Sequence, residues 1–196
     1  QHLEQFKRWY SQAGTPQVHA SGAFDADSGT YTLTLRQTCP ATPGQPDKQP
    51  FVIPVTLGLL DGQGKALPLQ LQGHNVGTEH TLVLHQEEQA WTFTGITSQP
   101  TPSLLRSLSA PVLLDYPFTE AELLTLLAHD SDAFNRWEAA QRLSLRIATN
   151  AIAATAETAT EKEQNPANLL PQSVVDALRL VLEHPQLDAA FKELVL

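Results

Sequence analysis

Alternation of apolar and polar residues dominates the first two thirds of the chain. It is clearest over residues 31–36, where Tyr31, Leu33 and Leu35 alternate with polar neighbours. Residues 18–22 show the same period of two, and residues 25–29 between the two runs have the composition of a turn. A period of two places alternate side chains on opposite faces of a strand. The pattern therefore predicts a hairpin.

Further strands are predicted over residues 51–60, 66–71, 81–85, 91–96, 103–108 and 111–116. The turn at residues 61–64 joins the first two of these runs into a second hairpin. Residues 39–50 contain four prolines, which exclude a helix or a central strand and indicate a loop. About seven or eight short strands without intervening helices are typical of an antiparallel, immunoglobulin-like β-sandwich. We assign this domain to residues 13–117.

Helical patterns replace the strand patterns after Pro117. Thr119 and Glu122 have the spacing of a capping box that opens a helix ending at His129. A second helix is predicted over residues 132–154. Its residues with a spacing of three or four, which share one face, are Phe134, Trp137, Ala140, Ser144, Ile147 and Ala151.

The end of the chain continues the helical pattern. Residues 155–168 are polar and predict a linker. Pro171 suits the first turn of a third helix that ends at Pro185, with Val174, Leu178 and Val181 directed inward, and a fourth helix begins near Gln186. Because so few helices cannot close a large core, we interpret residues 118–196 as the first helices of a larger helical domain.

Both ends of the chain look like interior segments of a longer protein. Residues 3–12 form a short helical stub with Phe6, Trp9 and Tyr10 as apolar residues, and the chain contains no methionine. The last residues, 191–196, are still amphipathic. We therefore expect the chain to be a piece of a larger polypeptide.

Charge and composition exclude several partners. The formal net charge is −9, from 12 basic and 21 acidic residues. Nucleic acids and anionic membranes need clustered lysine and arginine, so neither is an expected partner. No apolar run approaches the ~20 residues that span a bilayer. Cys39 is the single cysteine, which excludes an internal disulfide, and we expect a cytoplasmic location.

No metal or catalytic pattern emerges from the sequence. No two of the seven histidines have the spacing of the H-E-x-x-H zinc motif, and His80 and His85 point to opposite faces of a strand. Cys39 has no neighbouring cation or paired histidine in the sequence. Residues 62–64 read as a tight turn rather than as a nucleotide-binding loop. We predict no catalytic, cofactor-binding or metal-binding residues in this chain.

The remaining candidates are better explained by solvation or packing. Glu87 and Glu88 lie in a turn, and Glu120 and Glu122 lie in the first turn of a helix, where they offset the helix dipole. The tryptophans of a sugar-stacking surface would have to be exposed, whereas we expect core positions for Trp9, Trp91 and Trp137.

Four stretches of sequence together resemble one family. These are residues 6–16 (FKRWYSQAGTP), 31–37 (YTLTLRQ), 40–54 and 132–141 (DAFNRWEAAQ). In this order and spacing they resemble bacterial aminopeptidase N, of the zinc-dependent gluzincin family. The resemblance implies that residues 1–12 are the terminal helix of a preceding catalytic domain. It implies that residues 13–117 are a β-sandwich, followed by the opening of an α-helical C-terminal domain at 118–196.

The resemblance also implies what the segment does and lacks. The family uses zinc-activated water to remove N-terminal residues from peptides, on H-E-x-x-H, a further glutamate and a G-x-M-x-N motif. None of these motifs occurs here, so zinc and peptide substrates are expected for the parent, and this segment alone should be inactive. Its expected partners are the catalytic and helical domains of the parent. The alternative is a free-standing β-sandwich module that binds a glycan or peptide; an independent enzyme is the least supported reading.

Overall fold

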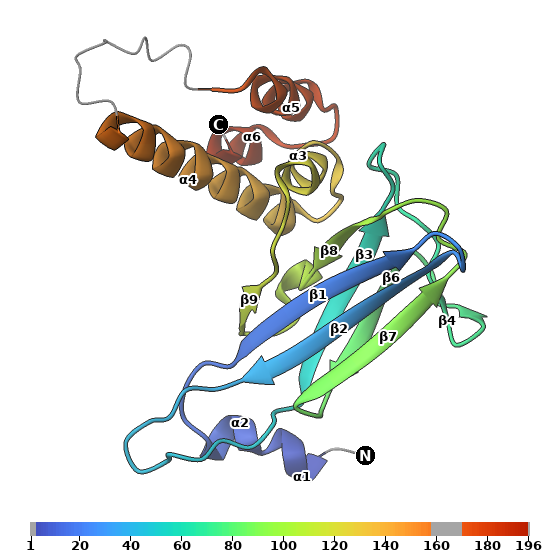
Figure 1. The fold of residues 1–196 in the computed structure, drawn as a ribbon, viewed down its shortest axis with the longest axis vertical. Coiled ribbons are helices and arrows are strands. Elements are labelled where there is room, and N and C mark those ends of the chain that lie inside the picture. The colour runs from blue at the N-terminus through green and yellow to red at the C-terminus, as the bar shows by residue number, and fades with distance from the viewer. Residues whose placement is uncertain (1–2, 158–169, 196) are drawn as a thin grey trace. The chain divides into compact units, whose positions relative to one another are not determined.

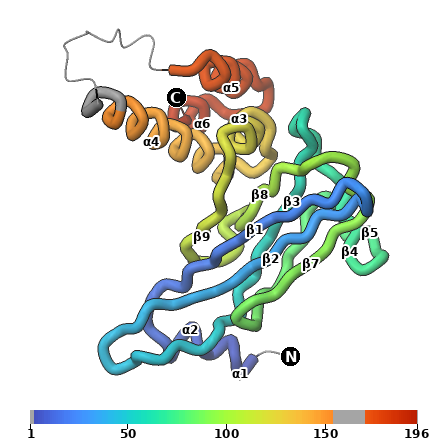
Figure 2. Tube along the Cα trace, in the orientation of Figure 1, coloured from blue at the N-terminus to red at the C-terminus, as the bar shows by residue number. Residues whose placement is uncertain are grey.

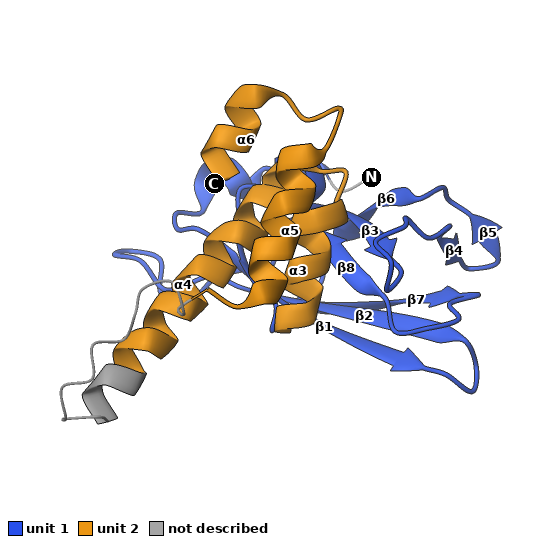
Figure 3. Cartoon of the chain, turned by 90° about the horizontal axis from the view of Figure 1, so that it is seen from above, with its two compact units in different colours: residues 1–117 blue, residues 118–196 orange. Residues whose placement is uncertain are grey.

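The computed structural model describes residues 3–157 and 170–195. The chain divides into two compact units, residues 1–117 and 118–196, which Figure 3 draws in different colours. Most of the linker predicted at residues 155–168 lies outside the described residues, and residues 155–157 belong to a helix.

The first unit is a sandwich of two β-sheets. The larger sheet has six strands in the order β5-β4-β7-β2-β1-β9, and the smaller has three in the order β6-β3-β8. Figure 1 shows β1, β2 and β7 side by side in one layer, with β3 and β6 in the other. The strands are β1 Gln17–Asp25, β2 Thr30–Thr38, β3 Ile53–Leu60, β4 Gln70–Leu71, β5 His74–Asn75, β6 Glu79–Leu84, β7 Glu88–Thr94, β8 Thr101–Leu104 and β9 Leu113–Asp115.

The core lies between these sheets and follows the predicted alternation. Tyr31, Leu33 and Leu35 of β2 are fully buried, and so are Val55 and Leu57 of β3. Alternate residues of a strand face one side of the sheet, so both sheets direct their apolar sets inward. The predicted immunoglobulin-like sandwich is confirmed, with nine strands among the described residues where about seven or eight were expected.

The first hairpin is confirmed. β1 and β2 pair antiparallel along their whole length, from Gln17 opposite Thr38 to Asp25 opposite Thr30. In the turn, a carboxylate oxygen of Asp25 accepts a hydrogen bond from the backbone N–H of Asp27 at 2.9 Å, and Ser28 Oγ donates to the other oxygen at 2.8 Å. These hydrogen bonds lower the pKa of Asp25, and the bond from the Ser28 hydroxyl contributes most to this shift.

The second predicted hairpin forms only next to its turn, where Leu60 bridges Ala66 and the backbone N–H of Leu67 donates to the carbonyl of Leu59 at 2.8 Å. Asp61 does organise a tight turn, accepting bonds from the backbone of Gln63 and Lys65. After a single bridge between Leu60 and Ala66, however, the chain leaves β3. β4 pairs instead with β7 in the other sheet, where Leu71 lies opposite Phe93. The apolar run at 66–71 therefore crosses between layers, with Leu69 fully buried.

The strands predicted at 103–108 and 111–116 are shorter than expected. β8 stops at Leu104, and β9 pairs parallel with β1, so the larger sheet is mixed rather than purely antiparallel. Leu105, Ser107 and Leu108 adopt left-handed backbone angles with φ of 55°, 54° and 50°. Non-glycine residues rarely adopt these angles, so local sequence preference does not predict this reversal.

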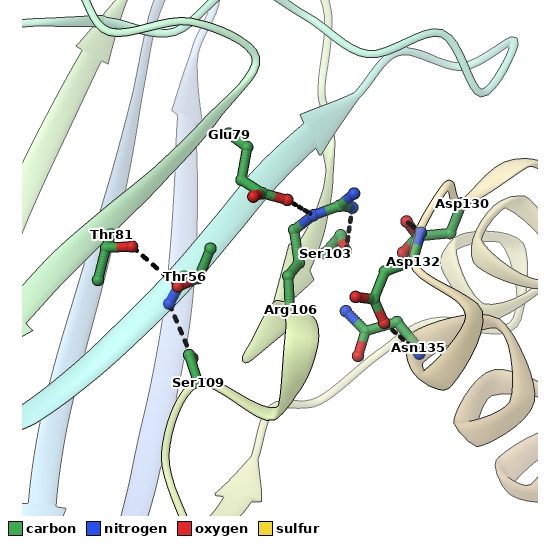
Figure 4. Close-up of polar contacts among 9 residues, drawn as sticks. All are labelled: Thr56, Glu79, Thr81, Ser103, Arg106, Ser109, Asp130, Asp132 and Asn135. Carbon is green, nitrogen blue, oxygen red and sulfur yellow. Dashed lines mark hydrogen bonds and ion pairs between the residues drawn. The ribbon is translucent and has the colours of Figure 1, made fainter.

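Side-chain bonds hold the strained turn in place. Arg106 makes two of these bonds (Figure 4). Its Nη1 donates to the hydroxyl of Ser103 on β8 at 2.9 Å, and its Nε donates to Glu79 on β6 at 2.5 Å. Ser109 Oγ accepts from the backbone of Thr56 on β3 at 3.0 Å. The turn is thus tied to β3 and β6, the other two strands of the sheet that holds β8, which offsets its backbone strain.

The N-terminal stub is helical, as predicted, but it is divided. α1 Leu3–Phe6 and α2 Arg8–Ser11 are separated at Lys7, which is the N-cap of α2. Gly14, with φ of 101°, and Pro16 then lead the chain into β1. The stub belongs to the same compact unit as the sandwich.

The second unit contains α3 Glu120–His129, α4 Ala133–Glu157, α5 Gln172–Glu183 and α6 Ala189–Val195. α3 packs on both α4 and α5, and α6 packs on α4. The capping box of α3 is confirmed, since Glu122 N–H donates to Thr119 Oγ1 and Thr119 N–H donates to Glu122 Oε2. α5 buries Val174 and Val181, with Leu178 half-buried, and α6 begins three residues after the predicted start.

The buried face of α4 is turned by about one residue from the predicted stripe. Ala140 is buried, whereas Phe134 is 39% exposed and Ser144 is exposed. The buried positions include Arg136, whose Nε and Nη2 donate to the carbonyl of Asp130 at 3.1 and 2.8 Å. Burial lowers the pKa of this guanidinium, and the carboxylate of Asp130 opposes that shift. An arginine therefore joins the end of α3 to α4 where an apolar contact was expected.

Candidate functional site

A set of polar contacts in the sandwich unit joins the N-terminal helices to the segment that precedes β3. Gln5, Arg8, Trp9 and Gln12 follow the spacing i, i+3, i+4, i+7, which places them on one helical face despite the break at Lys7. All four side chains are half-buried. We call these four residues the clamp. Figure 2 shows α1 and α2 beside the loop that connects β2 to β3.

Each clamp side chain donates to backbone carbonyls of residues 49–52. Arg8 Nη1 donates to Pro50, Trp9 Nε1 donates to Val52 at 2.9 Å, and Gln12 Nε2 donates to Gln49 at 2.9 Å. Gln12 also accepts from the backbone N–H of Gln49 at 2.8 Å. Gln5 Nε2 bonds to Pro50 at 3.1 Å and, beyond the segment, to the carbonyl of His85 at 2.6 Å.

These acceptors need partners from outside the sheet. Residues 49–52 are irregular and precede β3, so no ladder satisfies their carbonyls. The ring of Trp9 also packs on that of Phe51, with centroids 4.7 Å apart. Each such hydrogen bond contributes about 0.5–1.5 kcal/mol net, so together they fix the orientation of the stub on the sandwich.

The proline-rich loop holds the clamp from the other side. Gln45 Nε2 donates to the carbonyl of Ser11 at 2.9 Å, and Gln45 Oε1 accepts from the backbone of Ala13 at 2.7 Å. Lys48 Nζ donates to the carbonyl of Ala13 at 2.8 Å and to Thr42 Oγ1 at 2.6 Å. Residues 11–13, at the end of α2 and just after it, are thus held by hydrogen bonds with the side-chain amide of Gln45 and the ammonium group of Lys48.

Gln37 supports the same loop from beneath. Its side chain is 4% exposed, accepts from the backbone N–H of Phe51 at 2.7 Å and donates to the carbonyls of Phe51 and Gln86. A cleft of about 580 Å³ opens beside it, with Cys39, Lys48 and Glu87 among its lining residues. The polar groups here hold backbone in place, so the arrangement is one of positioning rather than of proton transfer.

One cluster has the order of a catalytic triad. His19 Nδ1 lies 2.9 Å from Asp115 Oδ2, and His19 Nε2 lies 3.3 Å from Thr38 Oγ1. The side chains of His19 and Asp115 are 42% and 73% exposed. Nucleophilic catalysis depends on preorganised dipoles in a water-excluded site. On a solvated strand face this cluster instead ties β1 to β2 and β9.

The other residues considered from sequence are dispersed. Cys39 donates to the carbonyl of Ala13 at 3.8 Å, and Glu87 lies 3.9 Å from Arg36. Glu122 serves the capping box. Trp9, Trp91 and Trp137 are half-buried rather than fully internal. Across residues 3–157 and 170–195, no three histidine, cysteine, aspartate or glutamate side chains form a group that could hold a metal.

Sequence reasoning missed the clamp. It grouped Phe6, Trp9 and Tyr10 as one apolar set, although Trp9 belongs to the docked face and the other two do not. The recurrence of long polar side chains at 5, 8 and 12 was the available signal.

In the part of the chain that is described, no helix is long and apolar enough to cross a membrane.

Comparison with known proteins assigns the fold to a family. Residues 14–117 match a domain of unknown function with an Ig-like fold, DUF3458, and residues 120–196 match DUF3458_C, described as ARM repeats. The first match covers more than half of the chain. The chain therefore belongs to the DUF3458 family.

The relatives that match nearly the whole chain are aminopeptidases. The chain is 39% identical to aminopeptidase N of Escherichia coli K12 over 188 residues, which are 96% of the chain and 21% of that protein. It is 35% identical to aminopeptidase N of Haemophilus influenzae over 99% of the chain and 21% of that protein. The resemblance to aminopeptidase N is confirmed, and the chain spans about a fifth of the length of the curated relatives it matches.

A solved structure has a similar fold. The crystal structure of Legionella pneumophila aminopeptidase A in complex with aspartic acid matches 99% of the chain and 20% of that protein, with 26% identity and a TM-score of 0.72. The chain thus corresponds to a non-catalytic part of an aminopeptidase. The described side chains do not fit the zinc that the family implies, so no step through zinc is assigned to this segment.

Proposed function

We propose that this chain is a structural segment of a zinc aminopeptidase that removes N-terminal residues from peptides. In this proposal the sandwich links the catalytic domain to the helical C-terminal domain. Residues 1–12 are then the terminal helix of the catalytic domain, and residues 118–196 open the helical domain. Peptide substrates and zinc belong to the parent enzyme.

The clamp is the observation that carries the proposal. The Ig-like family match begins at residue 14, so the stub lies outside that domain, yet its four clamp side chains are bonded to the sandwich. A helix that enters from a neighbouring domain and is held on one face transmits a fixed orientation. A flexible linker would need no such bonds.

The proposal is tested in the full-length aminopeptidase with the double variant Arg8→Ala/Gln12→Ala. The matched control is Gln63→Ala/Lys65→Ala, which removes the same types of group from an exposed turn. We expect the clamp variant to unfold in two separated calorimetric transitions and to have a lower kcat/KM for an aminoacyl anilide. The reason is that the stub no longer fixes the orientation of the sandwich relative to the catalytic domain. A clamp variant that melts and turns over like the control contradicts the linking role.

The free-standing binding module remains the alternative. A sugar-stacking surface would use open tryptophan rings, whereas the indole N–H of Trp9 donates to Val52 and its ring packs on Phe51. Saturable binding of a glycan or peptide by the chain would favour the module.

A further inference from the structure

Two arginine side chains of α4 converge on one residue. Arg142 and Arg146 are four positions apart, so they lie one turn apart on the same face of the helix. The guanidinium carbon of Arg142 lies 5.4 Å from the centroid of the Phe118 ring, and Arg146 Nη2 donates to the carbonyl oxygen of Phe118 at 2.9 Å. Two positive charges are therefore held close together beside α4.

A hollow of about 310 Å³ lies along the same face of α4. The residues that line it are Arg142, Leu145, Arg146, Thr149 and Asn150. They follow the spacing i, i+3, i+4, i+7, i+8, which is that of one helical face. The volume is near the lower end of the roughly 300–1,000 Å³ that small-molecule sites occupy. The hollow therefore has the size for a small ligand.

The charge along this face favours an anion. Residues 139–156 contain no aspartate or glutamate, although the chain as a whole carries a net charge of −9. Glu138 accepts from Arg142 Nε at 2.9 Å and so offsets one of the two positive charges. Arg146 bonds to a neutral carbonyl, which does not offset its charge. Like charges one turn apart repel each other, and an anion bound between them relieves that repulsion.

The donor groups match the oxygens of a phosphate. A guanidinium presents five N–H donors in a planar fork that pairs bidentately with phosphate. Among the described residues Arg146 is bonded through Nη2 alone, so its Nε and Nη1 can turn to a ligand. Thr149 Oγ1 donates to the carbonyl of Leu145 at 2.8 Å, which leaves the hydroxyl without a donor for the hollow. The amide of Asn150 supplies a further donor on this face.

We propose that Arg142, Arg146 and Asn150 form a binding site for a small molecule that carries a phosphate group. A phosphate monoester has a charge of about −1.5 to −2 at neutral pH, so it can bridge two guanidinium groups, whereas a carboxylate brings a single charge. The site lies in the helical unit and shares no residue with the clamp. It therefore goes beyond the proposed linking role and holds or fails separately from the clamp test.

Equilibrium dialysis of the full-length aminopeptidase against radiolabelled inorganic phosphate tests the site, with the ionic strength held constant by chloride. The test variant is Arg142→Gln/Arg146→Gln. The matched control is Arg36→Gln/Arg179→Gln, which removes two exposed arginines that also lie near carboxylates. We expect the test variant to bind one phosphate ion fewer per chain than the native enzyme, and the control to bind as many as the native enzyme. Equal binding by all three proteins overturns the proposal.

A second variant keeps the test decisive if the double variant does not fold. Asn150→Asp removes none of the contacts with Phe118 but places a carboxylate in the hollow. It should raise the Kd for phosphate at least about tenfold, whereas Asn75→Asp, at an exposed position of β5, should not. An unchanged Kd in Asn150→Asp would reject the site.

Competition identifies the chemistry of the ligand. Glycerol 3-phosphate should displace the labelled phosphate from the native enzyme, because the hollow has room for the rest of a small phosphate monoester. Acetate at the same concentration and ionic strength should leave the phosphate bound. Displacement by acetate as readily as by glycerol 3-phosphate would show a general anion surface and overturn the proposal.

Discussion

The ring of Tyr31 occupies the space that a side chain at Gly22 would need. A Cβ atom on Gly22 would lie 2.6 Å from Cζ and 2.9 Å from Cε2 of this fully buried tyrosine. Gly22 and Tyr31 lie on the neighbouring strands β1 and β2, and the missing side chain lets the ring cross the strand. A glycine is thus required here for close approach rather than for its backbone angles.

Gly22→Ala should therefore destabilise the sandwich by about 1–3 kcal/mol, because the ring or the strand must move. Gly62→Ala is the matched control, since no atom lies within 4 Å of a Cβ at that position. The measurement is urea unfolding of both variants, followed by circular dichroism. Equal midpoints for the two variants would refute the packing argument. Tyr31→Phe should not rescue Gly22→Ala, because the clashing ring carbons remain.

Gln37→Leu should cost about 1–3 kcal/mol for each buried group that is left unsatisfied. The variant keeps the approximate volume but removes the acceptor for Phe51 N–H and the donor for the carbonyls of Phe51 and Gln86. Gln63→Leu, in an exposed turn, is the control. Hydrogen exchange of the Phe51 amide should accelerate in the first variant only. An unchanged exchange rate would show that Gln37 does not hold the loop.

The turn at Asp25 should make the hairpin sensitive to acid. Hydrogen bonds from Ser28 and Asp27 lower the pKa of Asp25 in the folded chain, so the folded state binds this proton less readily than the unfolded state. The stabilisation is therefore complete above the unfolded pKa and is lost as the pH falls through the lower folded value. Asp25→Ala should reduce the melting temperature at neutral pH, and the difference from the parent chain should vanish in strong acid. A difference that is independent of pH would exclude this origin.

Thr119→Ala should destabilise the helical unit by about 0.5–2 kcal/mol, the usual cost of losing an N-cap. The hydroxyl accepts from Glu122 N–H at 3.2 Å, and its loss opens the first turn of α3. Thr125→Ala, within the same helix, removes a hydroxyl that bonds only to the preceding turn in the contacts described and should be close to neutral. Thermal unfolding followed at 222 nm, the far-ultraviolet helix band, compares the two. A larger loss for Thr125→Ala would contradict the capping assignment.

Local pattern sufficed where the structure depends on local chemistry. The β1–β2 hairpin rests on a period of two and a turn-forming Asp25, and the capping box rests on Thr119 and Glu122. Both were predicted because each is determined by residues that lie close together in the sequence. The burial of α4 was predicted less well, because Arg136 occupies a position that hydropathy excludes from a core.

The local sequence pattern did not predict which distant strands pair. Nothing near residues 66–71 indicates that β4 joins β7, and the left-handed angles of Leu105, Ser107 and Leu108 run against their own preferences. The clamp has the same origin, since Gln5 bonds to carbonyls 45 and 80 residues away. Every residue has a backbone carbonyl, so a side chain that donates to one does not require any particular residue type as its partner. The sequence of residues 49–52 therefore gives no sign that the clamp binds there.

We propose that this segment supports an aminopeptidase without supplying its chemistry. The most direct measurement is the hydrolysis of an aminoacyl anilide by the purified 196-residue chain, with zinc added and with a chelator. We expect no turnover above the uncatalysed rate in either condition. Turnover that requires zinc and is abolished by the chelator would contradict it.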